Sequence, residues 1–148
     1  APFEFGLEYQ GSAPLHCTIM PWFTTDKTTG TLVVGLLEVF KKTPPVELIS
    51  WKRAMFGKNN DVPVHMLSKE IGLIRLHVEL LDALKALEVD LADRQWMGAN
   101  WNPHVTDHEG QKFFPGLHAT VATAVMIEAE DPINRPLKKV VARFPLRG

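Results

Sequence analysis

The chain has few of the features that assign a protein to a class at once. Its 148 residues include a single cysteine, Cys17, so no disulfide can form within it. No apolar run approaches the roughly 20 residues that a membrane-spanning helix needs, and the chain does not open on a basic and then apolar leader. We therefore expect a cytoplasmic protein that does not bind a membrane, in a compartment that keeps thiols reduced.

The chain also has no large excess of positive or negative charge. Sixteen Lys and Arg residues stand against seventeen Asp and Glu residues, which gives a formal net charge of −1. A protein that tracks long nucleic acid by counterion release has a strongly basic surface, so the balance favours a small or short anionic ligand. The hydrophobic share of 45% is enough for one sizeable core. We expect residues 1–148 to form a single domain.

Hydrophobic periodicity predicts a mixture of helices and strands. Helices are expected where apolar residues recur at helical spacing, and strands where apolar runs are bounded by turn formers. The predicted helices cover residues 27–42 and 68–87, and the predicted strands cover residues 15–23, 46–55, 62–67, 101–106, 113–129 and 137–146. Asp26 or Thr28 is expected to cap the first helix, and Ser68 the second. The strands at 46–55 and 62–67 are predicted to form a hairpin, which makes α+β the expected fold class.

One tripeptide pattern occurs twice. His16-Cys17-Thr18, the first tripeptide, lies in one predicted strand, and His104-Val105-Thr106, the second tripeptide, lies in a later one. Because side chains alternate faces along a strand, the histidine and threonine of each copy project to one side and the central residue to the other. Two imidazoles can divide acid and base roles, since an imidazole pKa of about 6.5 allows either near neutral pH. Two hydroxyls can donate hydrogen bonds to oxygens that gain negative charge. Phosphodiester cleavage needs this set of groups.

The residues around the two tripeptides resemble those of a known family. Leu15-His16-Cys17-Thr18-Ile19 and, after a long predicted helix, Trp101-Asn102-Pro103-His104-Val105-Thr106 are similar to the paired motifs of the two-histidine phosphoesterase superfamily. That superfamily includes the bacterial 2′-5′ RNA ligase-like enzymes and 2′,3′-cyclic nucleotide phosphodiesterases. The resemblance spans most of the chain in the order of its elements, and its specific part is the two short motifs.

The resemblance implies a bilobal α+β fold, in which two lobes of antiparallel strands with flanking helices surround a central groove. It implies that His16 and His104 are catalytic, one as base and one as acid, and that Thr18 and Thr106 bind the substrate phosphate. The implied enzyme is a phosphoric diester hydrolase that acts on 2′,3′-cyclic phosphates or 2′-5′-type nucleotide or RNA linkages. No cofactor and no obligatory metal are implied. The expected partner is a small nucleotide or short RNA substrate, with no obligate protein partner.

Two features leave alternatives open. Asp107 stands where the family usually has an apolar residue, and a carboxylate beside a phosphate is repulsive unless it turns away or pairs with a cation. This favours a second hypothesis, a non-catalytic nucleotide- or RNA-binding module with the same fold. His118-Ala119-Thr120 also matches the bare tripeptide pattern. We favour His104 because the residues around it have the context of the family.

A zinc-dependent hydrolase is a third hypothesis. His104 and His108 have the spacing of two ligands on one helical face, and His118 would be a further ligand. Pro103 and the strand-like context oppose a helix there. In an extended strand His104 and His108 would lie about 13 Å apart, too far to share one ion. We therefore expect no metal site.

Other residues have plainer interpretations. Trp22 closes the strand of the first tripeptide and is the candidate for stacking on a base. His77 lies on the apolar face of the second predicted helix, which is typical of a hydrogen-bonded core histidine, and His65 is expected to be a strand residue. Cys17 faces away from His16 in an extended strand, which disfavours a Cys-His nucleophilic pair.

Overall fold

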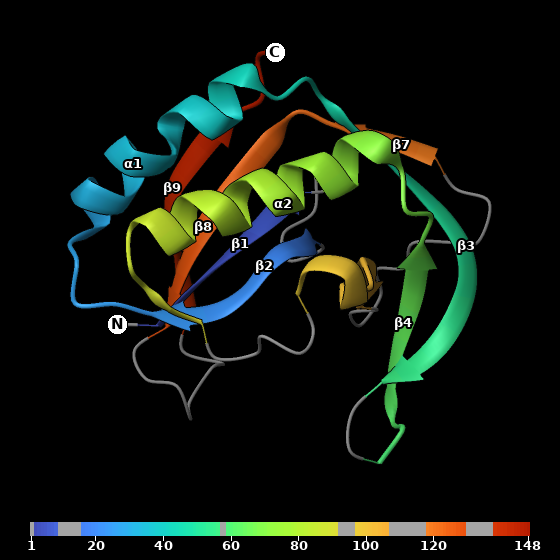
Figure 1. Ribbon diagram of the computed structural model, residues 1–148. Coiled ribbons are helices and arrows are strands. Elements are labelled where there is room, and N and C mark those ends of the chain that lie inside the picture. Colours follow the sequence, from blue (N-terminus) through green and yellow to red (C-terminus); the bar gives the residue numbers. More distant parts are fainter. Residues whose placement is uncertain (1, 9–15, 57–58, 92–96, 107–117, 130–137) are drawn as a thin grey trace.

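The computed structural model describes residues 2–8, 16–56, 59–91, 97–106, 118–129 and 138–148 (Figure 1). In chain order the elements are β1 (Pro2–Glu8), β2 (His16–Thr24), α1 (Thr29–Lys42), β3 (Val46–Phe56), β4 (Val62–Leu67), α2 (Ile71–Ala86), β5 (Asp90–Leu91), the 3-10 helix η2 (Gly98–Asn100), β6 (His104–Thr106), β7 (His118–Val121), β8 (Thr123–Ala129) and β9 (Lys138–Pro145). No helix in these ranges is long and apolar enough to cross a bilayer.

The described strands form one curled antiparallel sheet. Their order is β7-β3-β4-β6-β2-β1-β8-β9, and the short β5 pairs with the end of β2. We call β7, β3, β4 and β6 the second half of the sheet and β2, β1, β8 and β9 the first half, because each half contains one tripeptide. The halves meet where β6 pairs with β2. The predicted α+β class is confirmed, and the two expected lobes are the two halves of a continuous sheet.

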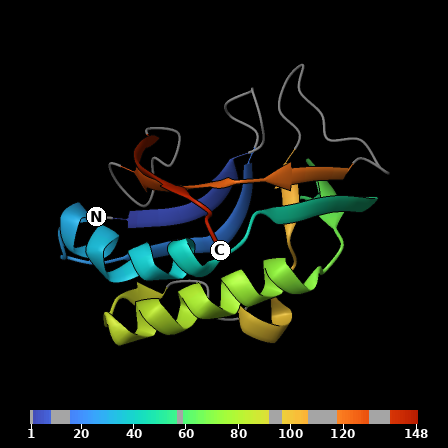
Figure 2. The same ribbon diagram turned by 90° about the horizontal axis from the view of Figure 1, so that it is seen from above.

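Both helices cover the same face of this sheet (Figure 2). Each helix buries one stripe of apolar residues against the sheet, as its periodicity predicts. The buried helical residues are Leu32, Leu36 and Phe40 from α1, and Leu73, Leu76, His77, Leu80 and Leu84 from α2. They share one core with residues of the sheet such as Phe5, Cys17 and Val105. This core holds the two halves together from one side of the sheet.

The two helices begin differently. Thr28 caps α1, and its hydroxyl oxygen accepts a hydrogen bond from the Thr31 N–H at 3.2 Å, as the sequence predicts. The prediction that Ser68 caps the second helix is wrong. The Ser68 N–H donates to the Ile49 carbonyl at 2.7 Å, so Ser68 still belongs to the strand pairing. The N-cap of α2 is Glu70, which makes no side-chain capping bond.

The strand predictions are confirmed for β2, the β3–β4 hairpin and β9, and they need correction elsewhere. Two strands were not predicted, β5 and β1, the second of which lies between β2 and β8. The predicted strand at 101–106 is only the three residues of β6. The described part of the predicted strand at 113–129 divides into β7 and β8 around Ala122. These differences arise because strand bounds depend on the pairing partner, which local periodicity does not specify.

Candidate active site

The backbone brings the two tripeptides side by side at the junction of the sheet halves. Cys17 of β2 pairs with Val105 of β6 in antiparallel register. In such a pair the next positions outward are also opposite each other, so position 16 faces position 106 and position 18 faces position 104. Each histidine position is therefore across from a threonine position. The segments are distant in the sequence, and only the sheet topology brings them together.

Burial identifies the face on which each tripeptide lies. Cys17 and Val105 are both fully buried in the core beneath the helices. Because strand residues alternate, Thr18 and His104 lie on the opposite face, where both are partly exposed. Directly opposed residues have Cβ atoms about 4.5–5.5 Å apart. An imidazole and a hydroxyl are thus neighbours on the face that the helices do not cover.

Two of the four predicted site residues are described only by their backbones. His16 pairs with Glu8 of β1, and Thr106 pairs with Val64 of β4. The side chains of His16 and Thr106 lie outside the described part of the structure, as does Asp107. The roles assigned to all four residues of the tripeptides therefore stay predictions, and the observed part is the register that places their backbones together.

Two of the contacts of the His104 ring fix its orientation. Its Nδ1 lies 2.9 Å from the Asn102 carbonyl oxygen. A carbonyl only accepts, so Nδ1 carries the proton, and the exchange of a proton with a ligand falls to Nε2. The Phe56 ring meets the imidazole edge-on, with centroids 4.7 Å apart and planes at 67°. Phe56 was not predicted from the sequence, because its place beside β6 depends on the curvature and pairing of β3 and β4.

The segment that leads into the second tripeptide is fixed by His77. This buried residue of α2 donates from Nδ1 to the Ile19 carbonyl at 2.8 Å and accepts at Nε2 from the Gly98 N–H at 2.9 Å. Its ring also stacks on Trp101, with centroids 4.2 Å apart and planes at 9°. Burial lowers the pKa of His77 from 6.5, and the hydrogen bond to Ile19 opposes that shift. The predicted satisfied core histidine is confirmed, and it links the strands of both tripeptides.

The hydrogen bond from Gly98 to His77 depends on a backbone conformation that favours glycine. The φ of Gly98 is +65°, in the left-handed region where a residue with a Cβ atom is strained. This turn directs its N–H at the imidazole of His77. Trp101, whose ring stacks on that imidazole, is only 4% exposed, and the chain then passes through Asn102 and Pro103 into β6.

Cys17 and His65 both lie on the face of the sheet that the helices cover. Burial raises the pKa of the Cys17 thiol to about 12, and a hydrogen bond with the His104 backbone offsets this in part. A thiol with that pKa is protonated at neutral pH and is a poor nucleophile. His65 of β4 pairs with Val105 and is 2% exposed. Neither side chain therefore reaches the face on which Thr18 and His104 lie.

The alternative second motif is on a strand that does not pair with the strand of the first tripeptide. His118 and Thr120 are on β7, at the edge of the sheet, and β3, β4 and β6 separate that strand from β2. His118 Nε2 is 3.2 Å from a carboxylate oxygen of Glu47, and both side chains are about half exposed. The zinc hypothesis needs His108, which lies outside the described residues. Within the described ranges no three His, Cys, Asp or Glu side chains gather closely enough to bind a metal ion.

Trp22, the candidate for base stacking, is mostly covered. Its exposed fraction is 9%, and it packs with Val125, Ile127 and Ala129 of β8. These residues form a small cluster on the face opposite to the helices. That packing leaves little of the Trp22 ring surface for a ligand.

Solved structures match the whole chain. TT0787 of Thermus thermophilus superposes with a TM-score of 0.70 at 14% identity, covering 100% of this chain and 99% of that one. E. coli LigT in complex with 3′-AMP gives 0.68 at 14% identity, with 100% of both chains covered. A protein described as a phosphoesterase gives 0.63 at 14% identity, covering 99% and 98%. No family model matches the chain, and no curated protein matches its sequence.

The likeness to these structures is one of fold, because the sequence identity is low. The overlap extends over nearly the complete length of each pair of chains, so it includes the two halves of the sheet and both helices. The α+β fold expected from the resemblance is therefore confirmed. This chain has the same fold as TT0787, E. coli LigT and the protein described as a phosphoesterase.

Proposed function

We propose that the protein is a phosphoric diester hydrolase that needs no metal and cleaves 2′,3′-cyclic phosphates or 2′-5′-type nucleotide linkages. The observation that carries this proposal is the register between Cys17 and Val105, which sets the two tripeptides beside each other. The fold of the phosphoesterases supports the same reaction class. Fold alone does not assign a reaction, so the proposal rests on the chemistry of the paired groups.

In the proposed reaction, one imidazole takes a proton from water as the water oxygen bonds to phosphorus. The bond from phosphorus to the leaving sugar oxygen breaks on the opposite side, and the second imidazole gives its proton to that oxygen. Histidines suit both roles because an imidazole exchanges protons near neutral pH. Thr18 and Thr106 donate hydrogen bonds to the non-bridging oxygens, where negative charge increases.

The contacts around His104 favour such a role. The Asn102 carbonyl keeps the Nδ1 proton in place, which leaves Nε2 as the atom that accepts or donates during the reaction. The Phe56 edge limits rotation of the ring. A catalytic group held in one orientation loses less entropy when the reacting atoms meet.

A small nucleotide or short RNA is the proposed substrate. E. coli LigT has been solved with 3′-AMP, with phosphate, with NADP+ and with ATP, and we extend that ligand class to this chain. The near-neutral net charge agrees with a short substrate, since long nucleic acid is bound through many basic contacts.

The test is hydrolysis of 2′,3′-cyclic nucleotides and short 2′-5′ oligonucleotides with a chelator present. His16→Ala and His104→Ala are each expected to lower kcat/KM by about 10²–10⁴-fold, the usual contribution of a general acid or base. His118→Ala is the matched control, because His118 lies at the edge of the sheet, and it is expected to retain activity.

Full activity in both His16→Ala and His104→Ala would reject the proposed site. Loss of activity in His118→Ala with His104→Ala still active would move the second motif to β7. Tight nucleotide binding without product, unchanged by either substitution of the tripeptide histidines, would instead support the non-catalytic nucleotide-binding module.

A further inference from the structure

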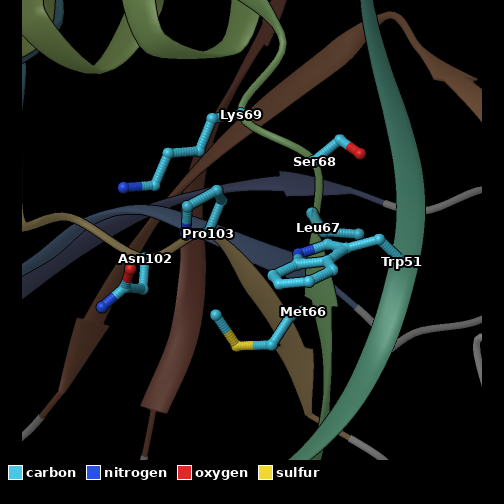
Figure 3. A pocket seen from close by; sticks show the side chains of 7 residues that line it. All are labelled: Trp51, Met66, Leu67, Ser68, Lys69, Asn102 and Pro103. Atoms are coloured by element: carbon cyan, nitrogen blue, oxygen red, sulfur yellow. The ribbon is translucent and has the colours of Figure 1, made fainter.

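A pocket of about 290 Å³ lies beside the second tripeptide (Figure 3). It is lined by Trp51 of β3, Met66 and Leu67 of β4, Ser68 and Lys69 before α2, and Asn102 and Pro103 before β6. In Figure 3 the Trp51 ring lies on one side of Pro103, and the Lys69 ammonium and the Asn102 amide lie on the other. The pocket thus combines an aromatic wall with polar and cationic groups. None of its residues belongs to a tripeptide.

The Trp51 ring is unusually accessible for its size. Trp51 is 55% exposed, whereas Trp22 and Trp101 are 9% and 4% exposed. The Lys52 ammonium lies 4.4 Å from the centre of the ring, and a cation at that distance is attracted by the ring face and helps to orient it. Tryptophan supplies a large rigid surface for stacking at low entropy cost. The side chain is therefore available to a ligand in a way that Trp22 is not.

The pocket and the second tripeptide share two structural links. Met66, which lines the pocket, pairs directly with His104 across β4 and β6. Asn102 takes part in both sites, because its side chain lines the pocket and its carbonyl oxygen accepts from His104 Nδ1. The pocket is therefore adjacent to His104, because the Cβ atoms of directly opposed strand residues lie about 5 Å apart.

We propose that this pocket binds the heterocyclic base of the nucleotide whose phosphate is held at the tripeptides. Trp51 stacks on the base, and the Asn102 amide, which both donates and accepts, contacts its polar edge. This inference rests on the proposed function for the position of the phosphate. It adds a specificity subsite, and it assigns the stacking role to Trp51 in place of Trp22.

The size and chemistry of the pocket fit a base better than other groups. Sites for whole small molecules span about 300–1,000 Å³, so this pocket suits one ring system and its attached sugar. An aliphatic ligand would leave the Asn102 amide and the Lys69 ammonium without matching groups. A planar heterocycle meets both the aromatic wall and the polar side, and Lys69 attracts the negative charge of its nucleotide.

The test measures binding of adenosine 3′-monophosphate and of the same sugar phosphate without the base, by calorimetry. Trp51→Ala is expected to weaken binding of the nucleotide about tenfold, the scale of one lost stacking contact, and to leave binding of the base-free compound unchanged. Trp51→Phe is expected to recover most of the loss. Met55→Ala is the matched control, since Met55 is 51% exposed on the same strand and does not line the pocket.

Equal nucleotide affinity in wild type, Trp51→Ala and Met55→Ala would overturn the subsite. An equal loss of affinity for both compounds in Trp51→Ala would also overturn it, because the effect would then not come from the base.

Hydrolysis separates this inference from the proposed function. Trp51→Ala should lower kcat/KM about tenfold for a nucleoside 2′,3′-cyclic phosphate and not for its base-free counterpart, whereas His104→Ala should lower both. If Trp51→Ala and wild type have the same kcat/KM for the nucleoside 2′,3′-cyclic phosphate, the subsite is rejected and the proposed function is kept. If wild type hydrolyses neither compound, the proposed reaction fails, and the calorimetric comparison still decides whether the pocket holds a base.

Discussion

The two halves of the sheet support the same tripeptide pattern by different means. The first tripeptide opens β2, a strand of nine residues that pairs with β1 along most of its length. The second occupies the whole of β6, which has three residues. β6 is held by three pairs with β4 and by the preceding segment, which His77 and Trp101 anchor. The place of the first tripeptide is fixed by a long strand and its neighbour, and the place of the second tripeptide is fixed by tertiary contacts.

This difference has a consequence for stability at the candidate site. A long strand keeps its geometry through many backbone hydrogen bonds, so the loss of one side chain changes it little. A three-residue strand depends on the few groups that anchor its entry. We therefore expect substitutions around His77 to affect the second tripeptide far more than substitutions at the edge of the sheet.

The largest expected effect is that of His77→Ala. The substitution leaves the Gly98 N–H and the Ile19 carbonyl without their buried partner and opens a cavity beside Trp101. We expect the free energy of unfolding to fall by about 3–5 kcal/mol, measured by urea denaturation. His118→Ala removes a half-exposed contact with Glu47 and should cost less than about 1 kcal/mol. A similar small cost for both variants would contradict the anchoring role of His77.

The second effect concerns Cys17, which lies on the buried face of the sheet where the two halves meet. With its pKa raised to about 12 by burial, the Cys17 thiol has about a thousandfold less thiolate than an ordinary cysteine at the same pH. In the folded protein we expect its reaction with an aromatic disulfide at about pH 8 to be slower by at least that factor than after unfolding in urea. Cys17→Ala should retain phosphodiesterase activity. Fast labelling of the folded protein would contradict the burial of this face.

The smallest effect is a pH dependence of stability that comes from His77. Burial lowers its folded-state pKa below 6.5, so below about pH 6.5 the unfolded chain takes up a proton that the folded protein does not. Stability should therefore fall as the pH is lowered from about 6.5 towards the folded-state pKa, by at most about 1.4 kcal/mol per pH unit from this residue. His77→Gln removes the titration, and its unfolding free energy should change less with pH. Parallel curves for the two proteins would show that His77 contributes nothing.

The parts of the fold that local patterns determine could be predicted from the sequence. The apolar periodicity of α1 and its Thr28 cap, the β3–β4 hairpin and β9 follow from residues close together in the chain. β1 was missed, although Phe3, Phe5 and Leu7 alternate, because its place between β2 and β8 depends on distant partners. The predicted start of α2 was wrong, because the Ile49 carbonyl takes the Ser68 N–H into the sheet.

The residues of the candidate site were proposed from the sequence, whereas the residues that surround them are known only from the structure. Alternation along a strand assigned each histidine and threonine to one face of its own strand before the pairing was known. The contacts of His104 with Phe56 and the Asn102 carbonyl required the pairing of β3, β4 and β6. The sequence does not show which of Trp51 and Trp22 can stack on a base, because both are tryptophans. Only their burial in the fold shows that the Trp51 ring is accessible and the Trp22 ring is covered.

A crystal structure with inorganic phosphate bound would show whether the two tripeptides form one site. We expect one phosphate at the junction of β2 and β6, with Nε2 of His16 and Nε2 of His104 on either side. The hydroxyls of Thr18 and Thr106 should lie within hydrogen-bond distance of its oxygens, about 2.5–3.0 Å. A phosphate bound at the β7 edge beside His118, or imidazoles of His16 and His104 on opposite faces of the sheet, would contradict it.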